Sequence, residues 1–169
     1  MRISTRVTPH YDIADSRIES PPSVTKPSAT IKMITAEDTY QIRQRVLWPD
    51  KPISSIKIAE DKNALHIGAF VDGKLVGIVS LFRDNENFQF RKLAVLAEHR
   101  GCGIGQKLIN ECIIKAREQQ VKILWCDARH SALDFYKKLD FTIDPETFIK
   151  NDKEYQKAYL DTSKKQAKL

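Results

Sequence analysis

Three of the six glycines in this 169-residue chain fall within five positions, and this cluster constrains the fold more than any other stretch. The segment Arg100-Gly-Cys-Gly-Ile-Gly105 follows an apolar stretch that begins at Leu93 and reads as a strand. Apolar residues then recur at the spacing of one helical face, which predicts a helix over 104–119. The first N–H groups of a helix lack internal partners and carry the positive end of its dipole. A strand, a glycine-rich loop and a helix start therefore form a candidate anion cradle.

Two familiar phosphate-binding motifs do not match this loop. No Lys-Ser or Lys-Thr follows Gly105, so the loop is not a Walker motif. The dinucleotide pattern G-x-G-x-x-G fails as well, because Gln106 and Leu108 stand where its last glycine would be. What remains is Arg-x-x-Gly-x-Gly after a strand. A glycine-rich turn without any ligand is the alternative interpretation.

The strand before this loop shows an irregular alternation. Phe88 and Phe90 alternate, and so do Leu93 and Val95, but the two pairs have opposite parity. A strand with two-residue periodicity keeps both pairs on one face only if an extra residue is inserted between them. The sequence therefore predicts a β-bulge near residues 91–93. Alternatively, the polar residues there mark the end of the strand.

The remaining patterns predict a mixed α/β domain. Thr35-Ala-Glu-Asp38 fits a capping box, which starts a helix that runs to about Leu47 and stops before Trp48-Pro49. Asp72-Gly73 fits a tight hairpin turn. Strands are expected at 31–34, 64–71, 74–82, 88–95, 121–127, 141–143 and about 155–160, with a short helix over 131–139. The proline-rich residues 1–30 are predicted to be a disordered leader, 31–160 the folded domain, and 161–169 a charged flexible tail.

Composition bounds the partners and the compartment. The chain has 28 basic and 22 acidic residues, a net charge of +6, which suits an anionic ligand but is not clustered enough to indicate nucleic acid. No apolar run reaches transmembrane length, so no membrane association is expected. Three cysteines without metal-ligand spacing and four scattered histidines suggest no metal site and a reducing compartment, the cytoplasm. A faint similarity of residues 1–11 to a presequence keeps the mitochondrion as an alternative.

Two motifs resemble those of one enzyme family. Arg100-x-x-Gly-x-Gly105 resembles the acetyl-CoA signature of the GNAT superfamily of N-acetyltransferases, usually written Gln/Arg-x-x-Gly-x-Gly/Ala. Phe135-Tyr-Lys-Lys-Leu-Asp-Phe141 resembles the family's Phe-Tyr-x-Lys-x-Gly-Phe, with Asp140 in place of glycine. The predicted element order over residues 31–160 coincides with the GNAT order, and the chain is most similar to uncharacterised members containing Trp-Cys-Asn/Asp-Ala-Arg. The resemblance implies a GNAT-like mixed central sheet with a splayed, bulged strand and flanking helices.

The resemblance also implies a co-substrate and a set of contacts. It implies acetyl-CoA as acyl donor without a metal, and Tyr136 as the general acid that protonates the departing thiolate; a phenol with a pKa of about 10 can do this at neutral pH. Tyr136 as an ordinary amphipathic core residue is the alternative. The implied cofactor contacts are Leu93, Ala94, Val95, Arg100, Gly101, Cys102, Gly103, Ile104, Gly105, Gln106, Ala128, Ser131 and Phe135.

The acceptor side is less defined. By the same resemblance, Arg43, Arg45, Trp48, Trp125, Asp127 and Arg129 are candidate substrate contacts. The bulged strand offers no carboxylate as general base, which leaves Asp127, Glu60 or Asp61, or water. We therefore expect acetyl transfer to a primary amine, small or peptidic, in a monomer or homodimer. Two alternatives stay open: a non-catalytic acyl-CoA-binding or interaction module, and a protein lysine or N-terminal acetyltransferase.

Overall fold

A computed structural model describes residues 28–165. The predicted leader lies outside the described residues up to position 27, and the end of the predicted tail lies outside them from position 166. Within the described part, Asp161 is the last residue of a strand and Thr162 is buried. No helix among residues 28–165 is long and apolar enough to cross a membrane.

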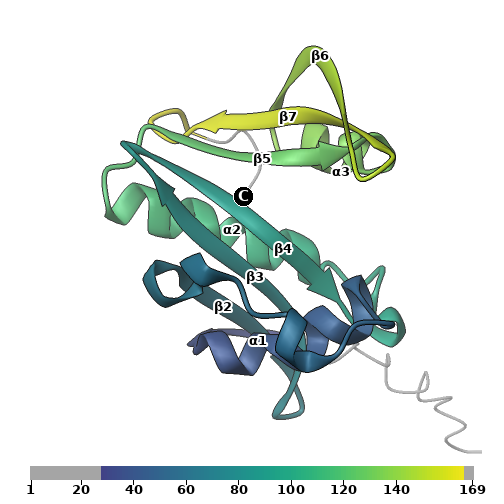
Figure 1. Cartoon of the computed structure of the whole chain (residues 1–169). Helices are drawn as coiled ribbons and strands as arrows, with labels where there is room; N and C mark the ends of the chain where they lie inside the picture. Colours follow the sequence, from purple (N-terminus) through teal and green to yellow (C-terminus); the bar gives the residue numbers. More distant parts are fainter. Residues whose placement is uncertain (1–27, 166–169) are drawn as a thin grey trace, which may run out of the picture.

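One seven-stranded sheet forms the centre of the domain, in the order β1-β2-β3-β4-β5-β7-β6 (Figure 1). All neighbouring strands are antiparallel except β4 and β5, which are parallel. The strands are β1 (Thr30–Ile34), β2 (Leu65–Val71), β3 (Lys74–Asp84), β4 (Asn87–Val95), β5 (Ile123–Arg129), β6 (Thr142–Lys150) and β7 (Lys153–Asp161). This is the predicted GNAT-like mixed sheet, although the last two strands are longer than the sequence patterns suggested.

Helices cover both faces of the sheet. The helices are α1 (Ala36–Ile42), which continues as a π-helical turn (Arg43–Leu47), α2 (Ile104–Glu118) and α3 (Leu133–Lys138). A Cβ on Gly77 in β3 would meet Ile104 and Leu108 of α2, whereas Ser80 in the same strand bonds to Arg43 at the end of α1. Residues three apart on a strand point to opposite faces. We therefore distinguish an α2 face, which also carries α3, from an α1 face.

Local sequence signals place the helices and turns as predicted. Thr35 and Asp38 form the reciprocal capping box, with N···O distances of 2.9 and 3.2 Å. The helix ends at Leu47, before Trp48-Pro49. All six apolar positions predicted for the 104–119 helix are buried: Ile104, Leu108, Ile109, Cys112, Ile113 and Ala116.

The predicted β-bulge is present in β4. Ser80 of β3 lies opposite Arg91 and Ile78 lies opposite Ala94, so β4 contains one residue more than β3 over this stretch. Lys92, within the bulge, has a φ of +60°. As a result Phe88, Phe90 and Val95 lie opposite the odd-numbered β3 residues Arg83, Leu81 and Gly77, all on the α2 face. The extra residue therefore brings Val95 to the same side as Phe88 and Phe90.

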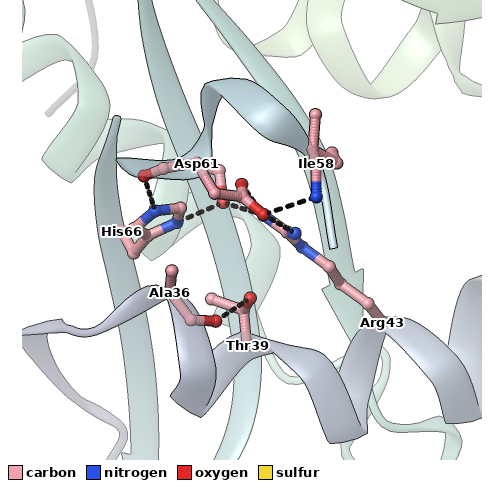
Figure 2. Close-up of polar contacts among 7 residues, drawn as sticks. Ala36, Thr39, Arg43, Ile58, Asp61 and His66 are labelled. Atoms are coloured by element: carbon pink, nitrogen blue, oxygen red, sulfur yellow. Dashed lines mark hydrogen bonds and ion pairs between the residues drawn. The ribbon is translucent and has the colours of Figure 1, made fainter. Parts of the chain in front are cut away.

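A buried ion pair joins the end of α1 to the loop before β2 (Figure 2). Arg43 donates to both carboxylate oxygens of Asp61 at 2.7 and 2.8 Å, and to the Ser80 hydroxyl at 2.9 Å. His66 Nε2 lies 2.9 Å from the Asp61 carbonyl oxygen, an acceptor, so Nδ1 is left to accept from Ser80 at 2.8 Å. Burial raises the pKa of the Asp61 carboxyl, but hydrogen bonds from Arg43 and Ile58 outweigh burial and hold the pKa below its ordinary value.

Replacing Asp61 tests how much this pair stabilises the fold. We expect Asp61→Asn to lower the free energy of unfolding by about 3 kcal/mol at pH 7, because the buried guanidinium loses its counter-charge. Urea denaturation would measure this difference. The carboxylate's contribution is present above about pH 4 and is lost as the pH falls through the lowered folded-state pKa, so the two proteins should converge in acid.

The matched control is Glu98→Gln, which breaks the exposed ion pair between Arg45 and Glu98 at 2.9 Å. Solvent screens that pair, so little change in stability is expected. Equal effects of the two substitutions would contradict the importance assigned to the Arg43–Asp61 pair.

Candidate active site

A cavity opens where β4 and β5 separate. The two strands pair only at Phe88–Leu124 and Gln89–Trp125, and then diverge toward their C-terminal ends (Figure 1). The gap holds a cavity of about 800 Å³, lined by residues of both strands, the turn after α1, α3 and the β6–β7 hairpin. Among the residues that the structure describes, no strand pairs with β4 on this side from Phe90 onward, so backbone groups along its edge face the cavity.

The three predicted contacts on β4 differ in orientation. Leu93 lines the cavity. Ala94 is buried opposite Ile78, so only its backbone is available to a ligand. The Val95 carbonyl accepts a hydrogen bond from Arg100 Nε at 3.1 Å, and Arg100 itself lines the cavity. The strand edge and the start of the glycine-rich loop thus meet at one end of the cavity.

The loop after β4 presents backbone N–H groups. Gly101 and Gly103 have φ values of +74° and +78°, a conformation that favours glycine, and a Cβ at either would meet nothing within 4 Å. Gly103 caps α2, and the first amide of the helix with a backbone partner is that of Lys107, 3.1 Å from the Gly103 carbonyl. The preceding N–H groups, including those of Ile104, Gly105 and Gln106, are therefore open to an anion.

The side chains around this loop differ in exposure and in what they can offer a ligand. A Cβ on Gly105 would lie 3.5 Å from the Phe135 ring, so the helix start and α3 approach closely here. Ile104 is buried and offers only its backbone, and Gln106 is exposed. Cys102 is an exposed free thiol whose Sγ lies 3.7 Å from the Arg100 carbonyl oxygen. The predicted cradle residues therefore lie together, and most offer N–H groups rather than side chains.

Tyr136 lies on α3 and lines the cavity beside Cys126 and Phe135. Its ring packs against Phe90 and Phe135 at centroid distances of 5.8 and 5.1 Å. Burial, with Cys126 nearby as a hydrogen-bond partner, raises the pKa of the Tyr136 phenol well above its ordinary value. Burial likewise raises the pKa of the Cys126 thiol. Both groups therefore keep their protons at neutral pH.

Asp140, which replaces the family's glycine after α3, has a φ of +66°. This is the left-handed conformation, which Asp tolerates better than most residues other than glycine.

The predicted residues after and along β5 separate into two groups. Asp127 and Arg129 line the cavity. Ala128 is buried on the opposite side of the strand, and Ser131 lies beside a smaller hollow that also includes Arg129. Trp125 does not line the cavity; its indole N–H donates to Asp84 at 3.2 Å, and Lys157 covers its ring at 4.5 Å.

The turn after α1 corrects part of the acceptor prediction. Trp48 lines the cavity, but Arg43 does not, because its guanidinium is fully buried and paired with Asp61. Arg45 points to solvent and pairs with Glu98. Asp61 is removed as a candidate base by the same buried pair, and Glu60 is exposed and does not line the cavity. Of the carboxylates in the described chain, Asp127 alone lines the cavity.

Several cavity residues were missed by sequence reasoning. Lys92 extends from the bulge toward Trp48, with its Nζ 4.3 Å from the ring centroid. Lys150, Lys153 and Tyr155 reach the cavity from the β6–β7 hairpin, which the sequence patterns outlined only in part. Burial and the neighbouring cations Arg91, Arg43, Lys150 and Lys51 lower the pKa of Lys92 to about 8. The one sequence signal that could have identified Lys92 as a cavity residue was its place in the polar pair Arg91-Lys92 at the predicted bulge.

The lowered pKa of Lys92 predicts a pH-dependent stability. The unfolded chain holds the Lys92 proton up to about pH 10.4, whereas the folded chain releases it near pH 8. We therefore expect the free energy of unfolding of the wild type to rise relative to Lys92→Met between about pH 8 and pH 10. Urea titrations followed by tryptophan fluorescence would measure it, and parallel pH profiles of the two proteins would contradict it.

Comparison with known proteins gives consistent matches. The sequence model described as the acetyltransferase (GNAT) family matches residues 32–141. The chain is 36% identical over 118 residues to an uncharacterized N-acetyltransferase of Bacillus subtilis (strain 168), YitI, covering 64% of this chain and 79% of that protein. It is 27% identical over 120 residues to an uncharacterized N-acetyltransferase of Pyropia yezoensis, ycf52. That match covers 68% of this chain and 69% of that protein.

Solved structures share the fold. An IAA acetyltransferase from Bacillus cereus ATCC 14579 superposes with a TM-score of 0.65 at 19% identity, covering 79% of this chain and 99% of that one. A GNAT family acetyltransferase from Elizabethkingia anophelis with acetyl-CoA bound gives a TM-score of 0.63 at 20% identity, covering 79% and 97%.

Proposed function

Because the chain belongs to the GNAT family of acetyltransferases, we propose that it transfers an acetyl group from acetyl-CoA to a primary amine by direct attack. The observation that carries this proposal is the cavity between the diverging strands β4 and β5. Arg100, at the start of the glycine-rich loop, lines one end of it, and Tyr136 of α3 lines it as well. A thioester arm placed along the β4 edge would run between these two features.

In the proposed reaction the amine nitrogen attacks the thioester carbonyl carbon. The carbon–sulfur bond then breaks, Tyr136 gives its proton to the leaving sulfur, and the amine loses one proton as the amide forms. N–H groups on the unpaired edge of β4, at Leu93 to Val95, stabilise the negative charge that develops on the carbonyl oxygen. The loop from Arg100 to Gln106 would hold the pyrophosphate of the cofactor.

The surroundings of Tyr136 support its role as general acid. Its pKa is raised by burial, so the phenol is protonated throughout the neutral range and has a proton to give. The Cys126 thiol lines the cavity beside Tyr136 and also contributes to the raised pKa of the phenol. In the proposed reaction the thiolate of CoA would accept the phenol proton.

Removal of the amine proton falls to Asp127 or to water. Asp127 lines the cavity and lies 3.9 Å from Lys150 across a weak ion pair. The absence of a carboxylate on β4 among the cavity residues favours a second candidate, an acyl-CoA-binding module without turnover. The two are distinguished by whether amines release CoA from the bound thioester. Peptides and small amines compared as acceptors distinguish a protein acetyltransferase from a small-molecule enzyme.

Charge placed at the loop tests the cofactor cradle. We expect Gly103→Glu to weaken acetyl-CoA binding by at least about tenfold, because the carboxylate repels the pyrophosphate in the confined loop. Gly73→Glu is a matched control, since Gly73 also has a positive φ, +75° against +78°, and a Cβ at either position would meet nothing within 4 Å. Isothermal titration of both variants would show a loss only at Gly103. Equal losses would remove the loop from the binding site.

Removing one hydroxyl tests the general acid. We expect Tyr136→Phe to lower kcat by about 10²-fold while acetyl-CoA still binds, since proton donation to a leaving group contributes that much. Tyr159→Phe is the control, because Tyr159 lies on β7 and does not line the cavity. Thiol release in steady state would measure both. An unchanged kcat in Tyr136→Phe would exclude this residue as the acid.

A further inference from the structure

The cavity has two sides that belong to different faces of the sheet. Phe135 and Tyr136 enter it from α3, on the α2 face, where the glycine-rich loop also lies. Trp48 enters from the end of α1, on the opposite face. The passage between β4 and β5 therefore connects the proposed cofactor side with a second compartment on the α1 face.

Cations gather in this second compartment. Arg91 lies opposite Ser80, which places it on the α1 face, and its guanidinium stacks 4.9 Å from the Phe82 ring centroid. Lys92 sits over the Trp48 ring at 4.3 Å. Lys150 reaches the same space from the end of β6, close enough to influence the pKa of Lys92. Asp127 is the one carboxylate that the described residues bring to the cavity, and its contact with Lys150 is long, at 3.9 Å.

These cations come from segments far apart in the sequence: the middle of β4 and the β6–β7 hairpin. Like charges held together in a half-buried cavity repel one another, and water screens them less than at an open surface. Burial is the main cause of the lowered pKa of Lys92, and repulsion from Arg91 and Lys150 adds to it. An anion bound between the three side chains would relieve the repulsion and would form charge-assisted hydrogen bonds.

A protonated amine alone would be repelled from such a compartment. A cavity with this positive charge therefore suits an acceptor amine that carries its own negative charge. The Trp48 ring beside Lys92 supplies an apolar wall for the carbon chain between the two groups.

We propose that the acceptor is a small primary amine bearing a carboxylate or a phosphate, and that Arg91, Lys92 and Lys150 bind this anionic group. The inference rests on the proposed acetyl transfer and names the substrate class of the same site. The pyrophosphate of acetyl-CoA is served by the loop and by Arg100 at the opposite face, so the three cations are free for the acceptor.

Pairs of amines that differ in one charge test the proposal. β-Alanine against β-alaninamide probes a carboxylate, and phosphoethanolamine against ethanolamine probes a phosphate. With acetyl-CoA and the full-length protein, kcat/KM should favour the anionic member of at least one pair by about tenfold or more, as expected for charge-assisted hydrogen bonds. The pair with the larger ratio identifies the anion. If acetyl-CoA binds but no amine is acetylated, the same pairs titrated into the CoA complex must show this preference in affinity.

A matched pair of variants assigns the preference to the compartment. Lys150→Gln should reduce the preference at least about fivefold without changing the affinity for acetyl-CoA. Lys157→Gln removes the same charge from the neighbouring strand at a residue that does not line the cavity, and should leave the preference intact. Lys92→Gln provides a second removal from a different strand.

Three results would overturn the inference. An anionic acceptor would be excluded if neutral or cationic amines were preferred, or if no preference were found in turnover or in binding. A preference lost equally in Lys150→Gln and Lys157→Gln would assign it to the overall charge of the protein. Weaker acetyl-CoA binding in Lys150→Gln would assign the cations to the cofactor. Failure of the wild type to bind acetyl-CoA at all is a different result, since it contradicts the proposed function itself.

Discussion

The extra residue in β4 is the constraint on which the rest of the site depends. It places Phe88, Phe90 and Val95 on one face, where they meet α2 and α3, and it turns Lys92 toward the opposite compartment at a positive φ. Beyond Gln89 no strand in the described part of the chain pairs with β4 on the β5 side, so the sheet opens without losing its core. A bulge bends its strand and interrupts its ladder. One inserted residue thus produces both the cavity and the open backbone edge that faces it.

The end of α1 contributes both to the stability of the fold and to the wall of the cavity. The π-helical turn from Arg43 to Leu47 ends in Trp48, whose ring forms a wall of the cavity. Arg43 anchors this turn through a bidentate pair with Asp61 and a hydrogen bond to Ser80. A buried ion pair contributes little net stability over an apolar substitute, but leaving either partner alone is costly. The pair therefore holds the wall of the proposed acceptor compartment in one position, while Lys92 and Lys150 supply its charge.

Much of the fold followed from local chemistry. The parity change between Phe90 and Leu93 predicted the bulge, Thr35 and Asp38 predicted a helix start, and six apolar positions predicted the buried face of α2; the structure bears these out. The positions of Arg43 and Asp61 did not follow, because the two residues are 18 apart and their pairing depends on packing against β3. The same holds for Lys150, whose approach to Lys92 requires the β6–β7 hairpin to return across the opening beside β5.

The sequence by itself determined the elements, the bulge and the family, because each rests on residues close together in the chain: helix caps, strand parity and the Arg100–Gly105 and Phe135–Phe141 motifs. Only the tertiary structure decided which charges face one another. It buried Arg43 with Asp61, turned Arg45 and Trp125 away from the cavity, and gathered Arg91, Lys92 and Lys150 around it. Electrostatic energy depends on distance and on burial, and neither is defined for residues far apart in the chain until the sheet has formed.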